Sequence, residues 1–194
     1  MCDMRDRVAI LITGLPGSGK SIVSTVAREC GLPVYTMGDI VREEILRRGL
    51  QASPQVFRRV SIILREELGL DAIAKLTLDK ICRSVDPRSE YIVIDGVRSL
   101  DEVRFFKRHF KECIILAIHA SPQTRFSRLS KRGREDDPRD WSEFESRDLQ
   151  ELSLGIGSVI ALADIVLLNE EVGLEEFKVL SRRVIERITK RKCL

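Results

Sequence analysis

Gly14-Leu15-Pro16-Gly17-Ser18-Gly19-Lys20-Ser21 is the stretch that decides how this chain folds. It matches the pattern G-x-x-x-x-G-K-[ST], in which a glycine-rich loop binds phosphate, at every fixed position. The apolar, β-branched run at 8–13 is typical of a buried strand, and residues 22–28 are typical of the first turns of a helix. The pattern forms a phosphate site in this strand–loop–helix context, so we expect one here.

The residues of this loop suit a nucleoside triphosphate. Glycines let the backbone wrap around phosphates with its N–H groups pointing inward, and a helix N-terminus adds partial positive charge. We expect all of 14–21 to bind ATP, with Lys20 reaching the β- and γ-phosphates and the Ser21 hydroxyl binding Mg²⁺. The alternative is a glycine-rich turn before an ordinary helix, which the fixed positions and their context disfavour.

Composition describes one globular domain with room for a small inserted lobe. The chain has 194 residues, of which 43% are hydrophobic and 32% are charged. A net charge of +3 is too small to indicate a nucleic-acid partner, so we expect none. Of the 33 basic residues 24 are arginine, whose planar fork binds phosphate oxygens in pairs. The alternative is that this excess reflects genome composition or heat adaptation.

Cysteine usage and hydropathy indicate a compartment. The five cysteines form no C-x-x-C pair and no metal-ligand spacing, and an odd number fits a reducing compartment. Cys82 and Cys113 lie in apolar runs and are expected to be small core residues. The first seven residues resemble no signal peptide, and no apolar stretch approaches the length of a membrane span. We therefore expect a cytoplasmic protein.

Strands and helices alternate along the chain. Such alternation predicts an α/β fold of three layers, with a parallel sheet covered by helices on both faces and right-handed crossovers. The five apolar runs that we interpret as its strands are 8–13, 33–36, 91–95, 113–118 and 164–168. The apolar spacing at 173–190 predicts a last helix, whereas the charged stretch 131–141 is typical of a loop.

The interval between the second and third strands contains no strand candidate. It predicts three helices, at about 40–48, 54–68 and 72–84, and Ser53-Pro54 is typical of an N-cap followed by proline at the first helical position. We expect these helices to form a lobe inserted into the domain, from 38 to 84. We expect the rest of the domain to consist of a core, formed by 1–37, 85–130 and 147–194, and a lid at about 131–146.

The run at 91–95 ends in a carboxylate, Asp95. In P-loop proteins an acidic residue at the end of a strand beside the loop helps to hold Mg²⁺. We therefore expect Asp95 to join Ser21 at the metal. The alternative is that Asp95 only begins the turn Asp95-Gly96.

Four further segments resemble motifs of the nucleoside monophosphate kinases, such as adenylate kinase and UMP/CMP kinase. Residues 37–42, M-G-D-I-V-R, resemble the T-G-D-x-x-R of that family, and residues 68–73, L-G-L-D-A-I, resemble L-V-P-D-x-x. Residues 95–99, D-G-V-R-S, resemble D-G-F-P-R-T. Residues 128–137, R-L-S-K-R-G-R-E-D-D, are similar to the R-L-x-x-R-G-R-x-D-D of members with a short lid, and Arg147 matches a further lid-side arginine.

The resemblance implies a P-loop kinase that transfers the γ-phosphoryl group of ATP to a nucleotide-type acceptor. The first choice of acceptor is a nucleoside monophosphate. It implies that Arg42 and Arg98 bind the phosphate of the acceptor and that 38–84 is an acceptor lobe. It further implies arginines that bind ATP (Arg128, Arg132) and arginines that join Lys20 in catalysis (Arg134, Arg147). Two anionic substrates meet in such a reaction, so positioning and charge stabilisation dominate catalysis.

The last third of the chain resembles a sister family, the dephospho-CoA kinases. The likeness lies in 163–169, A-D-I-V-L-L-N, and 173–177, G-L-E-E-F. It implies that Asp39 is the base for an acceptor hydroxyl. As a whole, the chain is similar to an archaeal group of predicted kinases related to adenylate kinase.

Departures from the family pattern leave the acceptor open. The segment 95–99 lacks the proline and is one residue shorter, which brings Glu102 to the place of the glutamine that reads the base. Glu102 could bind an amino group, pair with Arg98 or face water. Met37 also replaces a threonine. Two alternatives to a monophosphate kinase therefore stand: a dephospho-CoA kinase, and an ATPase or switch that acts on a macromolecule. The sequence does not set the oligomeric state.

Overall fold

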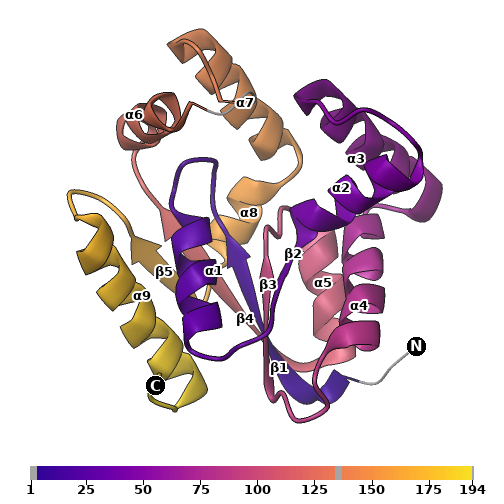
Figure 1. The fold of residues 1–194 in the computed structure, drawn as a ribbon, viewed down its shortest axis with the longest axis vertical. Coiled ribbons are helices and arrows are strands. Elements are labelled where there is room, and N and C mark those ends of the chain that lie inside the picture. The colour runs from indigo at the N-terminus through magenta and orange to yellow at the C-terminus, as the bar shows by residue number, and fades with distance from the viewer. Residues whose placement is uncertain (1–3, 134–136, 194) are drawn as a thin grey trace.

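A computed structural model describes residues 4–133 and 137–193 of the chain. At its centre lies one sheet of five parallel strands in the order β2-β3-β1-β4-β5 (Figure 1). The strands are β1 (Met4–Thr13), β2 (Val34–Thr36), β3 (Tyr91–Asp95), β4 (Phe110–His119) and β5 (Ile165–Leu168). The predicted parallel sheet is thus confirmed, although β1 and β4 extend beyond the apolar runs from which they were predicted.

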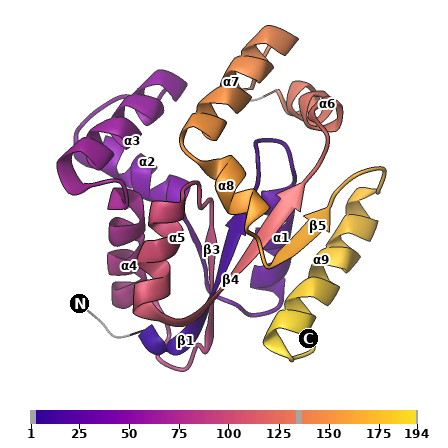
Figure 2. The ribbon, with the colours of Figure 1, turned by 180° about the vertical axis from the view of Figure 1, so that it is seen from behind.

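Helices cover both faces of this sheet. They are α1 (Lys20–Glu29), α2 (Met37–Arg47), α3 (Pro54–Leu68), α4 (Ala72–Ser84), α5 (Leu100–His109), α6 (Pro122–Arg132), α7 (Trp141–Ser153), α8 (Ile156–Ala161) and α9 (Leu174–Thr189). Figure 1 shows α1 and α9 against one face, and Figure 2, seen from behind, shows α5 and α8 against the other. None of the helices in residues 4–133 and 137–193 has the length and apolarity that a membrane span requires.

The central strand β1 supplies side chains to both layers, because successive residues of a strand point to opposite faces. Ile10 and Ile12 belong to the apolar cluster that includes Val23 of α1. Ala9 and Leu11 belong to the other cluster, which α2, α4 and α5 complete. All four of these β1 side chains are fully buried. A continuous apolar run is therefore what a strand covered on both sides requires.

The three helices predicted between the second and third strands are present. The bounds of α3 and α4 agree with the prediction, and the Ser53 hydroxyl caps α3 by accepting a hydrogen bond from the Val56 amide at 3.2 Å. In contrast, α2 begins at Met37, three residues earlier than expected. Because the chain turns into α2 directly after Thr36, the last residue of β2, Gly38 lies within the first turn of the helix.

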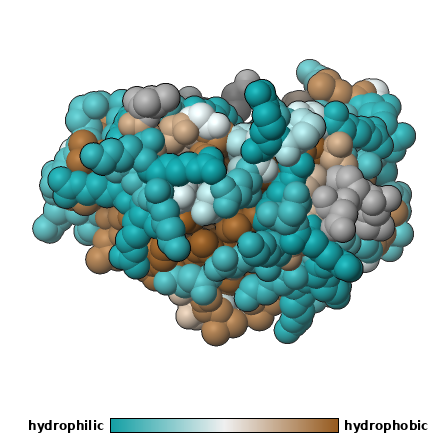
Figure 3. Space-filling view, turned by 90° about the horizontal axis from the view of Figure 1, so that it is seen from below, coloured by the Kyte–Doolittle hydropathy of each residue, from teal (hydrophilic) through white to brown (hydrophobic). Residues whose placement is uncertain are grey.

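The carboxyl ends of the strands meet at one edge of the sheet. Ile12 of β1 is in register with Asp95 of β3, so the loop that follows β1 lies beside that carboxylate. The chain leaves β1 between β3 on one side and β4 on the other, which is the place where parallel α/β sheets bind ligands. The opposite end, seen from below, is mostly hydrophilic around an apolar patch (Figure 3).

Three cysteines of the described residues are disulfide-bonded, which does not fit the reducing compartment that the sequence favours. Cys30, which follows α1, forms a disulfide with Cys193, which follows α9, and Cys82 is also disulfide-bonded. The partners Cys30 and Cys193 lie 163 residues apart in sequence, and they meet because α1 and α9 pack side by side. No spacing rule along the chain detects such a pair, and cysteine usage therefore gives no support for a reducing compartment. Cys113 is a free thiol that packs partly buried against the core.

We predict that the Cys30–Cys193 disulfide stabilises the fold. A bond that closes so long a loop restricts the unfolded chain, so Cys193→Ser should lower the free energy of unfolding by about 2 to 4 kcal/mol. Denaturant titration under oxidising conditions measures this. Cys113→Ser is the control, because burial raises the pKa of that free thiol to about 12 and keeps it protonated and unreactive. Equal stability of Cys193→Ser and the parent chain would contradict the prediction.

Candidate nucleotide and phosphoryl-transfer site

The loop between β1 and α1 approaches its neighbours so closely that only glycine fits. Gly14, Gly17 and Gly19 all have positive φ, a conformation that other residues rarely adopt. A Cβ atom at Gly14 would lie 2.3 Å from the carbonyl oxygen of Ile118 in β4, and one at Gly19 would lie 2.3 Å from Nδ2 of Asn169. The loop backbone is therefore packed against the backbone of β4 on one side and against the Asn169 side chain on the other.

Backbone amides in this loop have no acceptor within the protein. Within the described part of the chain, the N–H groups of Gly17, Gly19, Lys20 and Ser21 donate no hydrogen bond. These amides precede or begin α1, where the helix macrodipole adds partial positive charge. Adjacent unpaired donors at a helix N-terminus are what the phosphate oxygens of ATP need, so the residues present fit a triphosphate.

Lys20 folds back across the loop. Its Nζ donates to the carbonyl oxygens of Gly14 and Leu15, the second at 3.2 Å. Burial lowers the pKa of Lys20 to about 8, while the carboxylate of Asp95 acts in the opposite direction. The ammonium group is therefore poorly solvated and close to its point of deprotonation at mildly alkaline pH, and an incoming phosphate would stabilise its charged form.

Asp95 is buried at the end of β3, and Ser24 orients it. The Ser24 hydroxyl donates to Oδ2 of Asp95 at 2.7 Å, whereas Ser21 is exposed one helical turn earlier. Ser24 was not predicted from the sequence, although it follows Ser21 by three residues and therefore lies on the same face of the helix. The described residues contain no group of three or more His, Cys, Asp or Glu that could hold a metal. A hydroxyl and one carboxylate fit Mg²⁺, which takes its other ligands from water and phosphates.

Arg128 and Asn169 connect the end of β5 to the phosphate loop. Arg128 donates through Nη2 to the backbone and side-chain oxygens of Asn169, at 3.0 and 3.1 Å, and Nδ2 of Asn169 donates to the Ser18 carbonyl at 2.9 Å. Nη1 of Arg128 and the Ser18 hydroxyl are buried without a hydrogen-bond partner among the described residues. Arg128, predicted to bind ATP, thus lies beside the loop with one buried nitrogen that has no hydrogen-bond partner among the described residues.

A second arginine of α6, Arg125, was not singled out from the sequence. It is only 2% exposed, donates to the Pro16 carbonyl at 3.2 Å and forms a bidentate pair with Asp148 of α7. Its guanidinium carbon lies 4.9 Å from the centre of the Phe144 ring. Arg125 therefore ties the phosphate loop to α7, and no sequence pattern distinguishes such a buried arginine from its exposed neighbours.

Two of the predicted lid arginines lie in the helices on either side of the lid: Arg132 ends α6, and Arg147 lies within α7. Arg132 forms a bidentate pair with Asp137, and Nη1 of Arg147 lies 3.9 Å from Oδ1 of the same carboxylate. Arg134 lies outside the described residues. Asp137 thus draws the end of α6 and the middle of α7 together.

Among the residues predicted to bind an acceptor, Asp39 and Arg42 lie in α2. In α2, Nη1 of Arg42 donates to Oδ1 of Asp39 at 2.5 Å, and both side chains are at least half exposed. The Arg42 guanidinium also lies 5.8 Å from the centre of the Phe57 ring in α3. Asp39 and Arg42 therefore form one exposed ion pair rather than two independent groups.

Glu102 is buried and occupied by intramolecular partners. Its two carboxylate oxygens accept from the Arg98 amide at 2.8 Å and from Nη2 of Arg65 at 3.1 Å. Burial raises the pKa of Glu102, and the charge of Arg65 opposes this shift. Of the three possibilities that the sequence left open, solvent exposure is therefore wrong, and the contact with Arg98 runs through the main chain.

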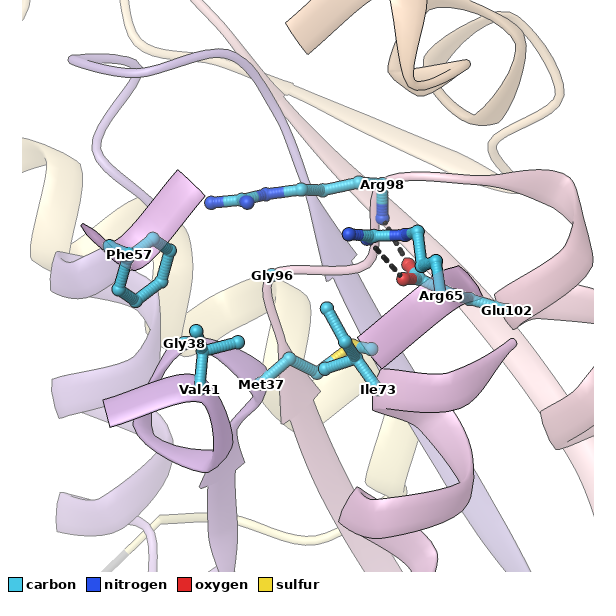
Figure 4. A pocket seen from close by; sticks show the side chains of 9 residues that line it. All are labelled: Met37, Gly38, Val41, Phe57, Arg65, Ile73, Gly96, Arg98 and Glu102. Carbon is cyan, nitrogen blue, oxygen red and sulfur yellow. Dashed lines mark hydrogen bonds and ion pairs between the residues drawn. The ribbon is translucent and has the colours of Figure 1, made fainter. Parts of the chain in front are cut away.

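A small pocket, with a cavity volume of about 10 Å³, lies beside the end of β3. Figure 4 shows Arg98 extended across it toward Phe57, with Arg65 and Glu102 paired at one side. The lining residues are Met37, Gly38, Val41, Phe57, Arg65, Ile73, Gly96, Arg98 and Glu102. Apolar side chains from α2, α3 and α4 thus lie beside guanidinium groups, and these side chains would have to move apart to admit an organic ligand.

Comparisons with known proteins agree with this architecture. Residues 13–145 match a family described as AAA domain. The chain is 51% identical over 183 residues to a UPF0200 protein of Hyperthermus butylicus, covering 94% of this chain and 96% of that protein. It is 50% identical over 184 residues to a UPF0200 protein of Thermococcus sibiricus, covering 94% of each.

Two solved structures of shikimate kinases share the fold. The enzyme from Bacteroides thetaiotaomicron has a TM-score of 0.58 at 16% identity, over 92% of this chain and 98% of that one. The enzyme from Acinetobacter baumannii, in complex with shikimate, has a TM-score of 0.59 at 14% identity, over 96% of each. At such low identity these likenesses concern the fold alone. The structures show that the chain has the fold of P-loop kinases. Its relatives of 50% identity and more show that the chain belongs to the UPF0200 family.

Proposed function

We propose that this chain is a phosphotransferase that moves the γ-phosphoryl group of ATP to a small nucleotide-type acceptor. The acceptor that we favour is a nucleoside monophosphate. The observation that carries the proposal is a juxtaposition. The phosphate loop and a pocket crossed by Arg98 adjoin the same end of β3. An ATPase that needs no small acceptor has no use for a second anion-binding pocket there.

On the donor side, the free amides of 14–21 would bind the phosphates and Lys20 would move from the loop carbonyls to the β- and γ-phosphates. Ser21 and Asp95 would hold Mg²⁺, which neutralises charge on the phosphates when bound. Arg128 and Arg132 would contact ATP from α6. Arg134 and Arg147 would stabilise the moving group from the lid at 131–146 and exclude water from it.

On the acceptor side, α2, α3 and α4 would act as the acceptor lobe at 38–84. Arg42 and Arg98 would bind the anionic group of the acceptor, while Phe57 and its apolar neighbours would contact its organic part. Glu102 would act by fixing Arg65 and the Arg98 backbone. A monophosphate acceptor is already ionised, so the reaction needs no base and Asp39 would serve only to hold Arg42.

We predict that binding of magnesium ATP draws a proton onto Lys20. Because burial lowers the pKa of Lys20 to about 8, roughly half of these side chains are neutral at pH 8, and phosphate charge raises that pKa again. Calorimetry at pH 8 in two buffers of different ionisation enthalpy should give an uptake of up to about 0.5 proton. Lys20→Met should abolish the uptake and weaken binding at least roughly 10-fold. Equal proton uptake in both proteins would contradict this role.

We predict that Arg42→Ala mainly raises the KM for the acceptor. Loss of a charged hydrogen bond of about 1.5–3 kcal/mol corresponds to roughly 10- to 100-fold. A kinetic screen of the common nucleoside monophosphates with ATP and Mg²⁺ identifies the acceptor on which KM is measured. Arg59→Ala is the matched control, because Arg59 is exposed in α3. Turnover with none of the monophosphates would reject this choice of acceptor, and an unchanged KM would reject the role of Arg42.

Substitution of Asp39 separates the two kinds of acceptor. If the acceptor is ionised, Asp39→Asn should change kcat less than about 10-fold, because no proton has to be removed. A hydroxyl acceptor, as in a dephospho-CoA kinase, needs that base, and kcat should then fall by about 10²- to 10⁴-fold. The measurement is kcat with each candidate acceptor at saturating ATP. A large fall confined to dephospho-CoA would replace our proposal with that alternative.

A further inference from the structure

A carboxylate of α7 contacts the arginine that crosses the pocket. Oε2 of Glu151 lies 3.2 Å from Nε of Arg98, as an ion pair, and the two side chains are 15% and 30% exposed. This oxygen is buried and accepts no hydrogen bond from the described residues, and its ion pair is with Arg98. Glu151 matches none of the motifs that the sequence supplied.

The contact uses one end of Arg98 and leaves the other open. The Arg98 amide donates to Glu102, and Nε lies 3.2 Å from Glu151 as an ion pair, so the backbone and the base of the guanidinium group both have partners. Within the described part of the chain, its terminal nitrogens Nη1 and Nη2 make no hydrogen bond. Figure 4 shows this terminal fork reaching across the pocket. Two parallel N–H donors in this arrangement match two oxygens of a phosphate group.

The helix that carries Glu151 is itself fixed to the phosphate loop. Asp148, three residues earlier in α7, forms the bidentate pair with Arg125, and Arg125 donates to the Pro16 carbonyl. Both Glu151 and Arg98 are near enough to Lys20 for their charges to act on it. Glu151 thus lies on a helix that is linked to the phosphate loop through Arg125 and to the pocket through Arg98.

We propose that Glu151 is a positioning residue, which holds Arg98 by Nε so that its two terminal nitrogens face the phosphate group of the acceptor. The inference rests on the proposed function for the identity of that anion. A flexible arginine loses conformational entropy when it binds a ligand, and a side chain that is already held loses less. The ion pair therefore contributes affinity although Glu151 does not touch the acceptor.

The direction in which Glu151→Gln changes anion affinity shows whether Glu151 positions Arg98 or acts only through its own charge. A carboxylate near a bound anion repels it, so if Glu151 acted only through its charge, Glu151→Gln would tighten anion binding. If Glu151 positions Arg98, the same substitution releases the guanidinium group and weakens binding. The two explanations predict opposite changes in one dissociation constant.

The probe is inorganic phosphate, titrated into the full chain saturated with magnesium ADP so that the phosphate loop is filled. Calorimetry gives the dissociation constant. Glu151→Gln should raise it roughly 5- to 10-fold, while Glu145→Gln, an equal change of charge at an exposed position of α7, should leave it within about 2-fold. Arg98→Lys, which keeps the charge but loses the fork, should raise it at least as much as Glu151→Gln.

An unchanged or lower dissociation constant in Glu151→Gln overturns the proposal. The proposal is also overturned if Arg98→Lys binds phosphate as tightly as the parent chain does, or if the parent chain binds no phosphate. Circular dichroism verifies that each variant is folded. Magnesium ADP binding is measured separately in the same experiment. Its absence would reject the proposed function, and the phosphate titration without ADP would still test the contact between Glu151 and Arg98.

Discussion

The close contact between the phosphate loop and the ends of β4 and β5 is the constraint on which the rest of the site depends. At Gly14 and Gly19 the backbone lies against Ile118 and Asn169 with no space for a Cβ atom. Asn169 also accepts from Arg128 and donates to the Ser18 carbonyl, which holds the loop from a third direction. A loop held so firmly keeps its amides turned inward before any ligand arrives, and such preorganisation is the main source of electrostatic stabilisation in enzymes.

Four arginines around the phosphate loop and the pocket share one feature. Each is paired with a carboxylate that fixes its direction: Arg125 with Asp148, Arg98 with Glu151, Arg65 with Glu102 and Arg42 with Asp39. Burial divides these pairs into two kinds. The first three include largely buried side chains and set fixed geometry, whereas the pair of Arg42 and Asp39 is screened by solvent and can rearrange at little cost. Three of the four pairs thus have fixed geometry, whereas the pair of Arg42 and Asp39 is adaptable.

Much of the fold could be predicted from the sequence because its features are local. The loop 14–21 has fixed positions, and buried strands such as β3 appear as short apolar runs bounded by turns. The rest depends on contacts between distant segments. Three features can be found only in the packed structure: the disulfide of Cys30 and Cys193, the buried Arg125 and the contact of Glu151 with Arg98. In the sequence, these charged residues look like exposed ones, and these cysteines look like free thiols.

Backbone amide NMR during titration with magnesium and a non-hydrolysable ATP analogue tests the central claim most directly. The account predicts large, saturable shifts for the amides of Gly17, Gly19, Lys20 and Ser21, because these donors have no acceptor in the described part of the chain. It also predicts that the Arg98 side-chain resonances shift further only when an acceptor monophosphate is added. If the loop amides fail to respond to the analogue, the loop does not bind a triphosphate and the account is contradicted.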